Sequence, residues 1–234
     1  MTQKLEVDAE RRIPLSADRV FSGAVALADD RGIGALTMRN LADELGVEAM
    51  SLYYHVKNKE AILDGVVVAI VKEIGEELGG LATATGSTDW KAHIRSRILT
   101  ARRVMLRHPW APEVIEARTS MIPEIVLYFE GLLSIMVQGG FSNDLAHHAL
   151  HAFGSRALGF TQELFAPDDE TAGDEMADQI LSQMAEKLPY MMAMMAEVAH
   201  DDPESTLGWC DDDTEFLFGL DMILDGLEKR LEAV

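Results

Sequence analysis

The chain has 234 residues and a mass of 25.8 kDa, and 48% of its residues are hydrophobic, so it can bury a core as one domain or as a small and a larger domain. No run reaches the roughly 18 apolar residues of a membrane-spanning helix, and the N-terminus lacks a signal peptide's apolar core, which predicts a cytoplasmic protein without a membrane partner. The single cysteine, Cys210, excludes an internal disulfide framework and cannot alone build a thiolate metal site.

The formal net charge of −20 is unevenly distributed along the chain. Residues 1–65 contain 8 Lys and Arg against 11 Asp and Glu, a net charge of −3, so the remaining residues carry −17. Between Arg31 and Lys59, basic residues outnumber acidic residues by four to three. The acidity that would repel a polyanion is therefore concentrated outside the first quarter of the chain.

Two helices with clear end signals are predicted near the N-terminus. Ser16 is a good N-cap for a first helix that ends before Gly32, where a left-handed cap is expected. Thr37 caps a second, short helix over Met38–Leu45, and Gly46 stops it.

A third helix is predicted to begin near Glu48, with Leu52 and Val56 turned inward. The small Ala42 and the turn at Gly46 allow it to cross the second helix closely, as a helix-turn-helix requires. Hydroxyl, imidazole and short apolar side chains on its other face can meet base edges and phosphates in a DNA major groove. The alternative is that the tyrosines only cover a three-helix core. The residues of this face are Ala49, Met50, Ser51, Tyr53, Tyr54 and His55.

The rest of the chain is also predicted to be helical. A long helix follows Asn58, and further helices are expected over Asp89–His108, about Ser120–Val137, Ser142–Phe165, a Met-rich run to Ala199, and Thr214–Leu231. No segment alternates with period two, so the predicted fold class is all-α. We place an N-terminal three-helix domain at residues 12–65 and a larger helical domain at residues 66–234, joined by the long helix.

One stretch carries a resemblance to a known family. The segment GIGALTMRNLADELGVEAMSLYYHVKNKEAILDGV resembles the N-terminal domain of the TetR family of transcriptional regulators, most of all its tetracycline-repressor branch. The similarity is dense from about Leu15 to Val66. It implies a dimer whose third helices enter successive major grooves of double-stranded operator DNA, with a C-terminal domain for ligand binding and dimerisation.

The resemblance also implies individual DNA contacts. Arg39 matches a residue that reaches bases from the second helix, while Thr37 and Lys59 match phosphate-contacting positions. Ala49, Met50, Ser51, Tyr53, Tyr54 and His55 match the recognition helix. Glu48 stands where many relatives have a serine cap, and Ala49 and Met50 replace more polar or proline-containing pairs. The operator therefore need not be a tetracycline operator.

The similarity continues more weakly into the C-terminal region, through Trp90, the Arg102–Arg103 pair and the QGGFS motif. The family implies a four-helix bundle between two subunits, here a homodimer through the helices over Ser142–Phe165 and Thr214–Leu231. The last helix has an apolar stripe wide enough for such a seam, formed by Phe216, Leu217, Leu220, Ile223, Leu224 and Leu227. The alternative is a helix that packs only within its own subunit.

Tetracycline-type repressors bind a magnesium–drug chelate, and most of the matched positions differ here. Gly75, Arg97, Ala101, Leu132 and Ser155 replace drug-contacting residues, and only Glu163 is retained. Neither magnesium nor any other cofactor is therefore predicted. The pocket walls that the resemblance implies are Arg97, Ala101, Met105, Tyr128, Leu132, His151, Ser155 and Phe160. One arginine among apolar residues favours a mainly hydrophobic effector with an acidic or carbonyl group.

We therefore expect a DNA-binding transcriptional regulator, a homodimeric repressor that a small effector releases from its operator, and not an enzyme. Two other classes stay open. His147 and His151 have the i, i+4 spacing of a metal site, with His148 beside them, which would suit a metal-dependent helical enzyme. A helical interaction protein without DNA contacts is the second alternative. We do not favour metal binding by these histidines, because a histidine at a dimer interface is more often a hydrogen-bonded core residue.

Overall fold

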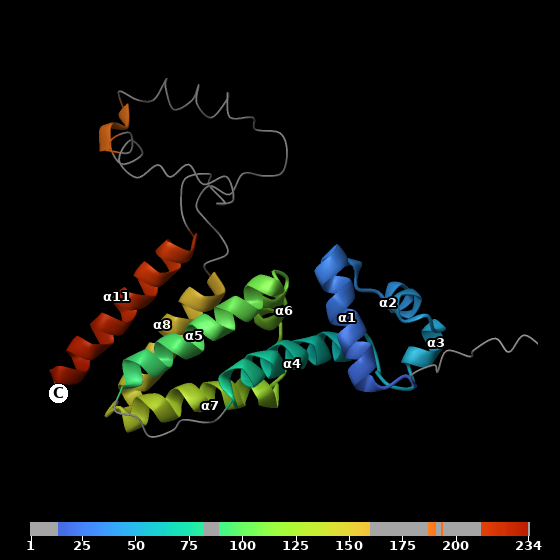
Figure 1. Cartoon of the computed structure of the whole chain (residues 1–234), viewed down its shortest axis with the longest axis horizontal. Helices are drawn as coiled ribbons and strands as arrows, with labels where there is room; N and C mark the ends of the chain where they lie inside the picture. The colour runs from blue at the N-terminus through green and yellow to red at the C-terminus, as the bar shows by residue number, and fades with distance from the viewer. Residues whose placement is uncertain (1–13, 82–88, 160–186, 191–192, 194–211, 234) are drawn as a thin grey trace, which may run out of the picture. The chain divides into compact units, whose positions relative to one another are not determined.

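The computed structural model describes residues 14–81, 89–159, 187–190, 193 and 212–233, and within these ranges the chain is helical without a strand (Figure 1). The predicted all-α fold is confirmed. The described residues pack into two compact units, one from the chain up to residue 85 with residues 99–134, the other from residues 86–98 with the chain from residue 135 onward. Among the described helices, none is long and apolar enough to cross a membrane. The functional domain boundary at residue 65 stays a prediction.

The first unit begins with four short elements: α1 (Ala17–Arg31), the 3-10 helix η1 (Ile33–Ala35), α2 (Met38–Leu45) and α3 (Ala49–Leu52). The predicted caps are present. The Ser16 hydroxyl accepts from the backbone N–H of Arg19 at 3.2 Å, and the Thr37 hydroxyl accepts from that of Asn40 at 3.1 Å. Each side chain satisfies an N–H that a helix start would otherwise leave unpaired, which explains why both helices begin where the sequence predicts.

A small core holds α1, α2 and α4 (Lys59–Leu78) together. Gly65 of α4 lies so close to the Phe21 ring of α1 that a Cβ atom there would overlap the ring. Glycine is needed at this crossing because the Phe21 ring occupies the space that a side chain at residue 65 would fill. Its buried side chains include Val20, Ala24, Leu27, Leu41, Leu52, Ile62 and Val66.

The first unit continues through the C-terminal part of α5 (Trp90–Arg107), then α6 (Ala111–Glu116) and the start of α7 (Pro123–Gln138). The predicted helices did not include α6, because one helix was expected to end at His108 and the next to begin at about Ser120. Pro112 instead lies in the first turn of α6, where a proline costs no backbone hydrogen bond. The burial of Ala111, Pro112 and Val114 stabilises this short helix.

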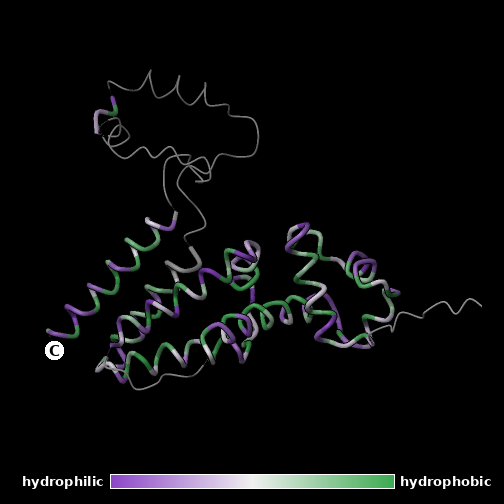
Figure 2. The backbone as a smooth tube through the Cα atoms, in the orientation of Figure 1, coloured by the Kyte–Doolittle hydropathy of each residue, from purple (hydrophilic) through white to green (hydrophobic). Residues whose placement is uncertain are grey.

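The second unit contains the start of α5, the end of α7, α8 (Asn143–Gly159) and α11 (Asp212–Glu232). Trp90 packs edge-on against Phe141, with 4.8 Å between ring centroids. In Figure 2 the turns of α11 alternate between hydrophilic and hydrophobic colours, which is typical of a helix with one buried face. Residues 160–165 of the predicted helix and most of the Met-rich run lie outside the described residues.

Candidate nucleic-acid interface

The turn between α2 and α3 sets the angle of the helix-turn-helix. Gly46 ends α2 in the left-handed conformation, with φ 65° and ψ 36°, which a residue with a Cβ rarely adopts. The backbone N–H of Val47 donates to the Ala42 carbonyl at 3.0 Å. The Arg19 guanidinium of α1 donates to the Leu45 carbonyl at 3.2 Å, so α1 also fixes the end of α2.

The third helix is shorter than the sequence predicts. Only Ala49–Leu52 are α-helical, and the chain then tightens into a turn in which the Leu52 carbonyl accepts from the N–H groups of both His55 and Val56 at 2.9 Å. Leu52 and Val56 are buried, as expected, and hold this segment against the core. Two buried side chains four residues apart therefore orient a segment that is too short to be stable as an isolated helix.

The outer face of this segment is open to solvent. Met50 is 69% exposed, Tyr53 48% and Tyr54 88%, and His55 is exposed as well, while Ala49 and Ser51 are half-buried. We call Met50, Tyr53, Tyr54 and His55 the recognition surface. None of its members is sealed in the core, so their aromatic rings, hydroxyls and imidazole can reach a ligand as large as a DNA duplex.

Cations and a helix N-terminus border the recognition surface in the chain. Arg39 is exposed on α2, and Lys59 is exposed at the first position of α4, where the Asn58 side chain accepts from the N–H of Ala61 at 2.9 Å. A helix N-terminus with a lysine in its first turn favours phosphate. Thr37, also exposed, already uses its hydroxyl as a cap, so its remaining capacity toward a phosphate is to donate the hydroxyl proton.

Two further residues belong with this surface. Lys57 is exposed in the turn between His55 and the start of α4. It adds a cation that the set of residues carried over from the family omits, although its position between His55 and Lys59 was visible in the sequence. Arg19 acts indirectly, through the Leu45 carbonyl, and no sequence pattern could reveal a contact between residues 26 positions apart.

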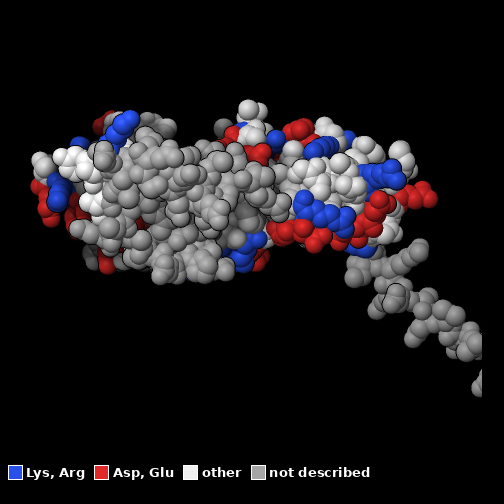
Figure 3. Space-filling view, turned by 90° about the horizontal axis from the view of Figure 1, so that it is seen from above, with Lys and Arg blue, Asp and Glu red and all other residues white. Residues whose placement is uncertain are grey.

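The surface charge around these helices is mixed. Figure 3 shows Lys and Arg side chains beside Asp and Glu side chains on the face of the N-terminal helices that it presents. Arg31, for example, pairs with Asp30 at 3.1 Å and with Glu44 at 3.6 Å. On the face that Figure 3 presents, side chains of both signs therefore lie beside one another, and neither sign dominates.

The residues predicted to line an effector pocket have different environments. Arg97, Ala101 and Met105 recur every four residues along α5 and are all buried. On α7, Leu132 is buried and Tyr128 is half-buried. His151 is exposed on α8, and both Phe160 and the side chain of Ser155 lie outside the described residues. These residues remain a prediction.

Two sequence profiles cover most of the chain. The profile of bacterial regulatory proteins of the tetR family matches residues 20–66, and that of the tetracyclin repressor-like C-terminal domain matches residues 82–231. The chain belongs to the TetR family. It is a DNA-binding transcriptional regulator with an N-terminal helix-turn-helix.

Relatives of this TetR-family chain match it over nearly its whole length. It is 28% identical to the class D tetracycline repressor of Escherichia coli over 222 residues, which cover 94% of this chain and 92% of the relative. Apo ActR from Streptomyces coelicolor shares the fold, with a TM-score of 0.72, 24% identity, and coverage of 95% and 99% of the two chains. ActR in complex with actinorhodin matches with a TM-score of 0.71 and 25% identity over 94% and 99%.

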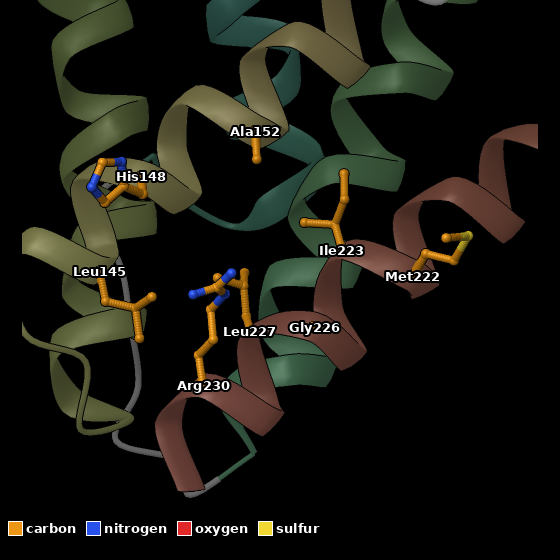
Figure 4. A pocket seen from close by; sticks show the side chains of 8 residues that line it. All are labelled: Leu145, His148, Ala152, Met222, Ile223, Gly226, Leu227 and Arg230. Atoms are coloured by element: carbon orange, nitrogen blue, oxygen red, sulfur yellow. The ribbon is translucent and has the colours of Figure 1, made fainter. Parts of the chain in front are cut away.

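The second unit of this TetR-family regulator presents a groove of about 450 Å³ between α8 and α11. Figure 4 shows Arg230 reaching from α11 toward the side of the groove that α8 forms. Phe218 and Met222, also on α11, are exposed. The lining is mainly apolar and consists of Leu145, His148, Ala152, Met222, Ile223, Gly226, Leu227 and Arg230.

The three histidines of α8 are exposed side chains. The rings of His147 and His151 lie edge-on, with centroids 4.6 Å apart, and His148 lies 3.8 Å from the carboxylate of Asp144. In the described part of the chain, no three His, Cys, Asp or Glu side chains are grouped as metal ligands would be.

Proposed function

We propose that the chain is a homodimeric repressor, active in the cytoplasm without catalysing a reaction, that a small and mainly hydrophobic effector releases from operator DNA. One observation carries the DNA-binding part: the recognition surface is exposed while Leu52 and Val56 fix its backbone. In this proposal Tyr53, Tyr54 and His55 meet the duplex together with Ala49, Met50 and Ser51, and Arg39 reaches base edges.

Phosphate contacts fix the register of the protein on the duplex. We assign them to Thr37 and Lys59, with Lys57 as an added contact. All three residues are exposed and adjoin a helix start or the recognition surface in the chain. Because few cations are involved, the affinity falls with salt concentration but less steeply than for a protein with a broad basic face.

Two identical subunits are needed because a single short segment reads few base pairs. A second copy that covers the exposed face of α11 and the α8–α11 groove would supply the matching half-site, about 34 Å away along the duplex. The similarity to the class D tetracycline repressor and to ActR in complex with actinorhodin supports a repressor that responds to a small molecule. We place the domain boundary near residue 65.

The test begins with selection of bound duplexes from a random library by the purified full-length protein. The double variant Tyr53→Ala, Lys59→Ala should lose specific binding of the selected duplex, measured by fluorescence anisotropy, and keep the oligomeric state of the wild type in sedimentation velocity. Lys72→Ala removes an exposed lysine of α4 and serves as the control. Unchanged affinity in the double variant would refute the assigned interface.

The effector proposal has a separate test. Aromatic carboxylic acids and their methyl esters can be compared as releasing agents for the selected duplex. If the buried Arg97 guanidinium meets the acid group, the acids release DNA at lower concentration than the esters, and Arg97→Gln removes that preference. Equal potency of acid and ester in the wild type would argue against this role of Arg97.

A further inference from the structure

An arginine just beyond α6 holds the start of α4. Arg118 lies two residues past the end of α6, and only 12% of its side chain is exposed. Its Nη1 donates to the Glu60 carboxylate at 2.8 Å and to the Asp64 carboxylate at 3.4 Å. The Ser120 hydroxyl donates to the same Asp64 oxygen at 3.2 Å. A short segment that is distant in sequence therefore holds two carboxylates in the first two turns of α4.

These carboxylates lie next to the lysines that we assign to phosphate. Lys57 precedes α4, Lys59 is its first residue, and Glu60 follows directly. Among the described residues, neither lysine forms an ion pair, whereas Glu60 and Asp64 both pair with Arg118. The charges of the two lysines and the two carboxylates would cancel without Arg118. With it, the start of α4 keeps a net positive charge.

An uncompensated carboxylate at this helix start would compete with DNA. The N-terminus of a helix attracts negative charge, and a carboxylate in the first turn uses the same attraction as a phosphate. Glu60 lies in that turn. An arginine that pairs with Glu60 compensates its charge and orients it, so the helix N-terminus and Lys59 stay available to a phosphate.

We propose that Arg118 is a positioning residue for operator binding, which acts through Glu60 and Asp64 and does not itself touch the duplex. It keeps the start of α4 favourable to a backbone phosphate. This role rests on the proposed function, since it requires the phosphate contacts of Lys57 and Lys59. It places a determinant of DNA affinity outside residues 20–66, the part of the chain that matches the tetR-family regulatory profile.

The substitution Arg118→Gln tests the role of the charge. Fluorescence anisotropy measures the affinity of the full-length protein for the selected duplex at about 0.1 M salt, where charges act over about 10 Å. The affinity should fall about 3- to 30-fold, because a charge near a helix N-terminus is lost in each of two subunits. Arg118→Lys keeps the positive charge and should retain most of the wild-type affinity.

The double variant Arg118→Gln, Glu60→Gln separates the charge effect from a purely structural role. It lacks the arginine and also the carboxylate that the arginine compensates, so its net charge equals that of the wild type. Binding should therefore recover to near the wild-type affinity. A purely structural role predicts that the double variant binds as weakly as Arg118→Gln, because the ion pair between Arg118 and Glu60 is absent in both.

Glu60→Gln alone is a variant that does not disturb the buried arginine. The Glu60 side chain is 66% exposed, so the substitution leaves the packing of α4 unchanged. It removes the competing carboxylate and keeps Arg118, so the variant should bind the duplex at least as tightly as the wild type. Weaker binding by Glu60→Gln would overturn the proposal.

Arg103→Gln is the matched control. Arg103 also donates to a carboxylate of α4, that of Glu77 at 2.9 Å, so its loss makes the same change in net charge. Glu77 lies near the opposite end of α4, about 27 Å from Lys59 along the helix axis at about 1.5 Å per residue, well beyond the screening length. The affinity of Arg103→Gln should therefore equal that of the wild type.

Equal affinities of Arg118→Gln and Arg103→Gln would overturn the proposal, and so would a double variant that fails to recover binding. Lys59→Ala distinguishes this failure from failure of the proposed function. If Lys59→Ala weakens binding while Arg118→Gln does not, only the role of Arg118 is wrong. If Lys59→Ala binds as tightly as the wild type, the phosphate contact itself is wrong, and the role of Arg118 is refuted with it.

Discussion

The recognition surface and the exposed face of α11 both present large apolar side chains to solvent, yet their surroundings differ. Met50, Tyr53 and Tyr54 lie on a segment that the exposed Lys57 and Lys59 follow directly in the chain. Phe218 and Met222 lie on a helix with seven Asp and Glu residues against one lysine and one arginine. Aromatic hydroxyls beside cations suit a polyanion, whereas an apolar stripe on an acidic helix suits another protein surface.

The two surfaces are also held in place differently. Buried Leu52 and Val56 anchor the recognition surface from below. By contrast, α11 combines buried Phe216, Leu220 and Leu224 with ion pairs to the start of α5. Those pairs join Lys91 to Asp225 at 2.6 Å and to Glu228 at 2.7 Å, and Arg95 to Asp221 at 2.9 Å. The first surface thus depends on packing and the second on packing and surface charge.

The largest expected effect on stability comes from truncating a buried side chain that holds the recognition surface against the core. Leu52→Ala should lower the free energy of unfolding by about 2–5 kcal/mol, because it leaves a cavity at a fully buried site. Tyr54→Ala should change it by less than about 0.5 kcal/mol, because the ring is exposed. Denaturant unfolding measures both. Equal losses for the two variants would mean that Tyr54 belongs to the core.

The role of the exposed face of α11 in self-association can be tested by placing a charged side chain on it. Phe218→Lys should weaken self-association about tenfold or more, since an aromatic side chain central to an interface commonly contributes about 2 kcal/mol or more. Sedimentation velocity over a concentration series gives the dissociation constant. Glu232→Gln makes the same change in net charge near the end of the helix and should leave association unchanged. A monomeric wild type would contradict the proposed seam directly.

The variants Gly65→Ala and Gly226→Ala compare a glycine packed against a neighbouring ring with a glycine that has open space beside it. In Gly65→Ala the added methyl group would overlap the Phe21 ring, so unfolding should become easier by about 1–3 kcal/mol. Gly226→Ala on α11 meets no atom within 4 Å and should instead stabilise the isolated subunit by about 0.5–1 kcal/mol. If Gly226→Ala also weakens self-association, the groove that Gly226 lines is covered in the dimer.

The smallest effect is expected at the ion pairs of α11. Hydrogen bonds from Lys91 hold the pKa of Asp225 below its ordinary value, and the pKa of Lys91 is raised by Asp225 and Glu228. The contribution of Asp225 is therefore present at neutral pH and is lost only as pH falls through its lowered folded-state pKa. In Lys91→Met, the loss of this stability contribution as pH falls should be absent. The unfolding midpoint at neutral pH should be slightly lower than that of the wild type in low salt.

High salt should abolish the difference between Lys91→Met and the wild type, because the pairs are partly exposed and screened. Lys72→Met, on α4, is the control for loss of a lysine charge. A salt-independent effect of Lys91→Met would indicate lost packing of the lysine stem instead.

The sequence by itself determined where most helices begin and the family to which the chain belongs. The capping residues Ser16, Thr37, Asn58, Asp89 and Ser142 accept the backbone hydrogen bonds expected of them. Caps and apolar periodicity act over three or four residues, so the local sequence contains the whole interaction. The inward positions Leu52 and Val56, and the outward tyrosines, followed from the same short-range periodicity.

Only the tertiary structure decided what depends on residues far apart in the chain. The burial that stabilises the short α6, and the contact of Arg19 with the end of α2, are examples. The pairing of His108 with Asp29 and Glu73 is another, and no pattern in the sequence marked it. A buried polar group must find its partners wherever packing places them, and that placement is fixed by the helix crossings rather than by neighbouring residues.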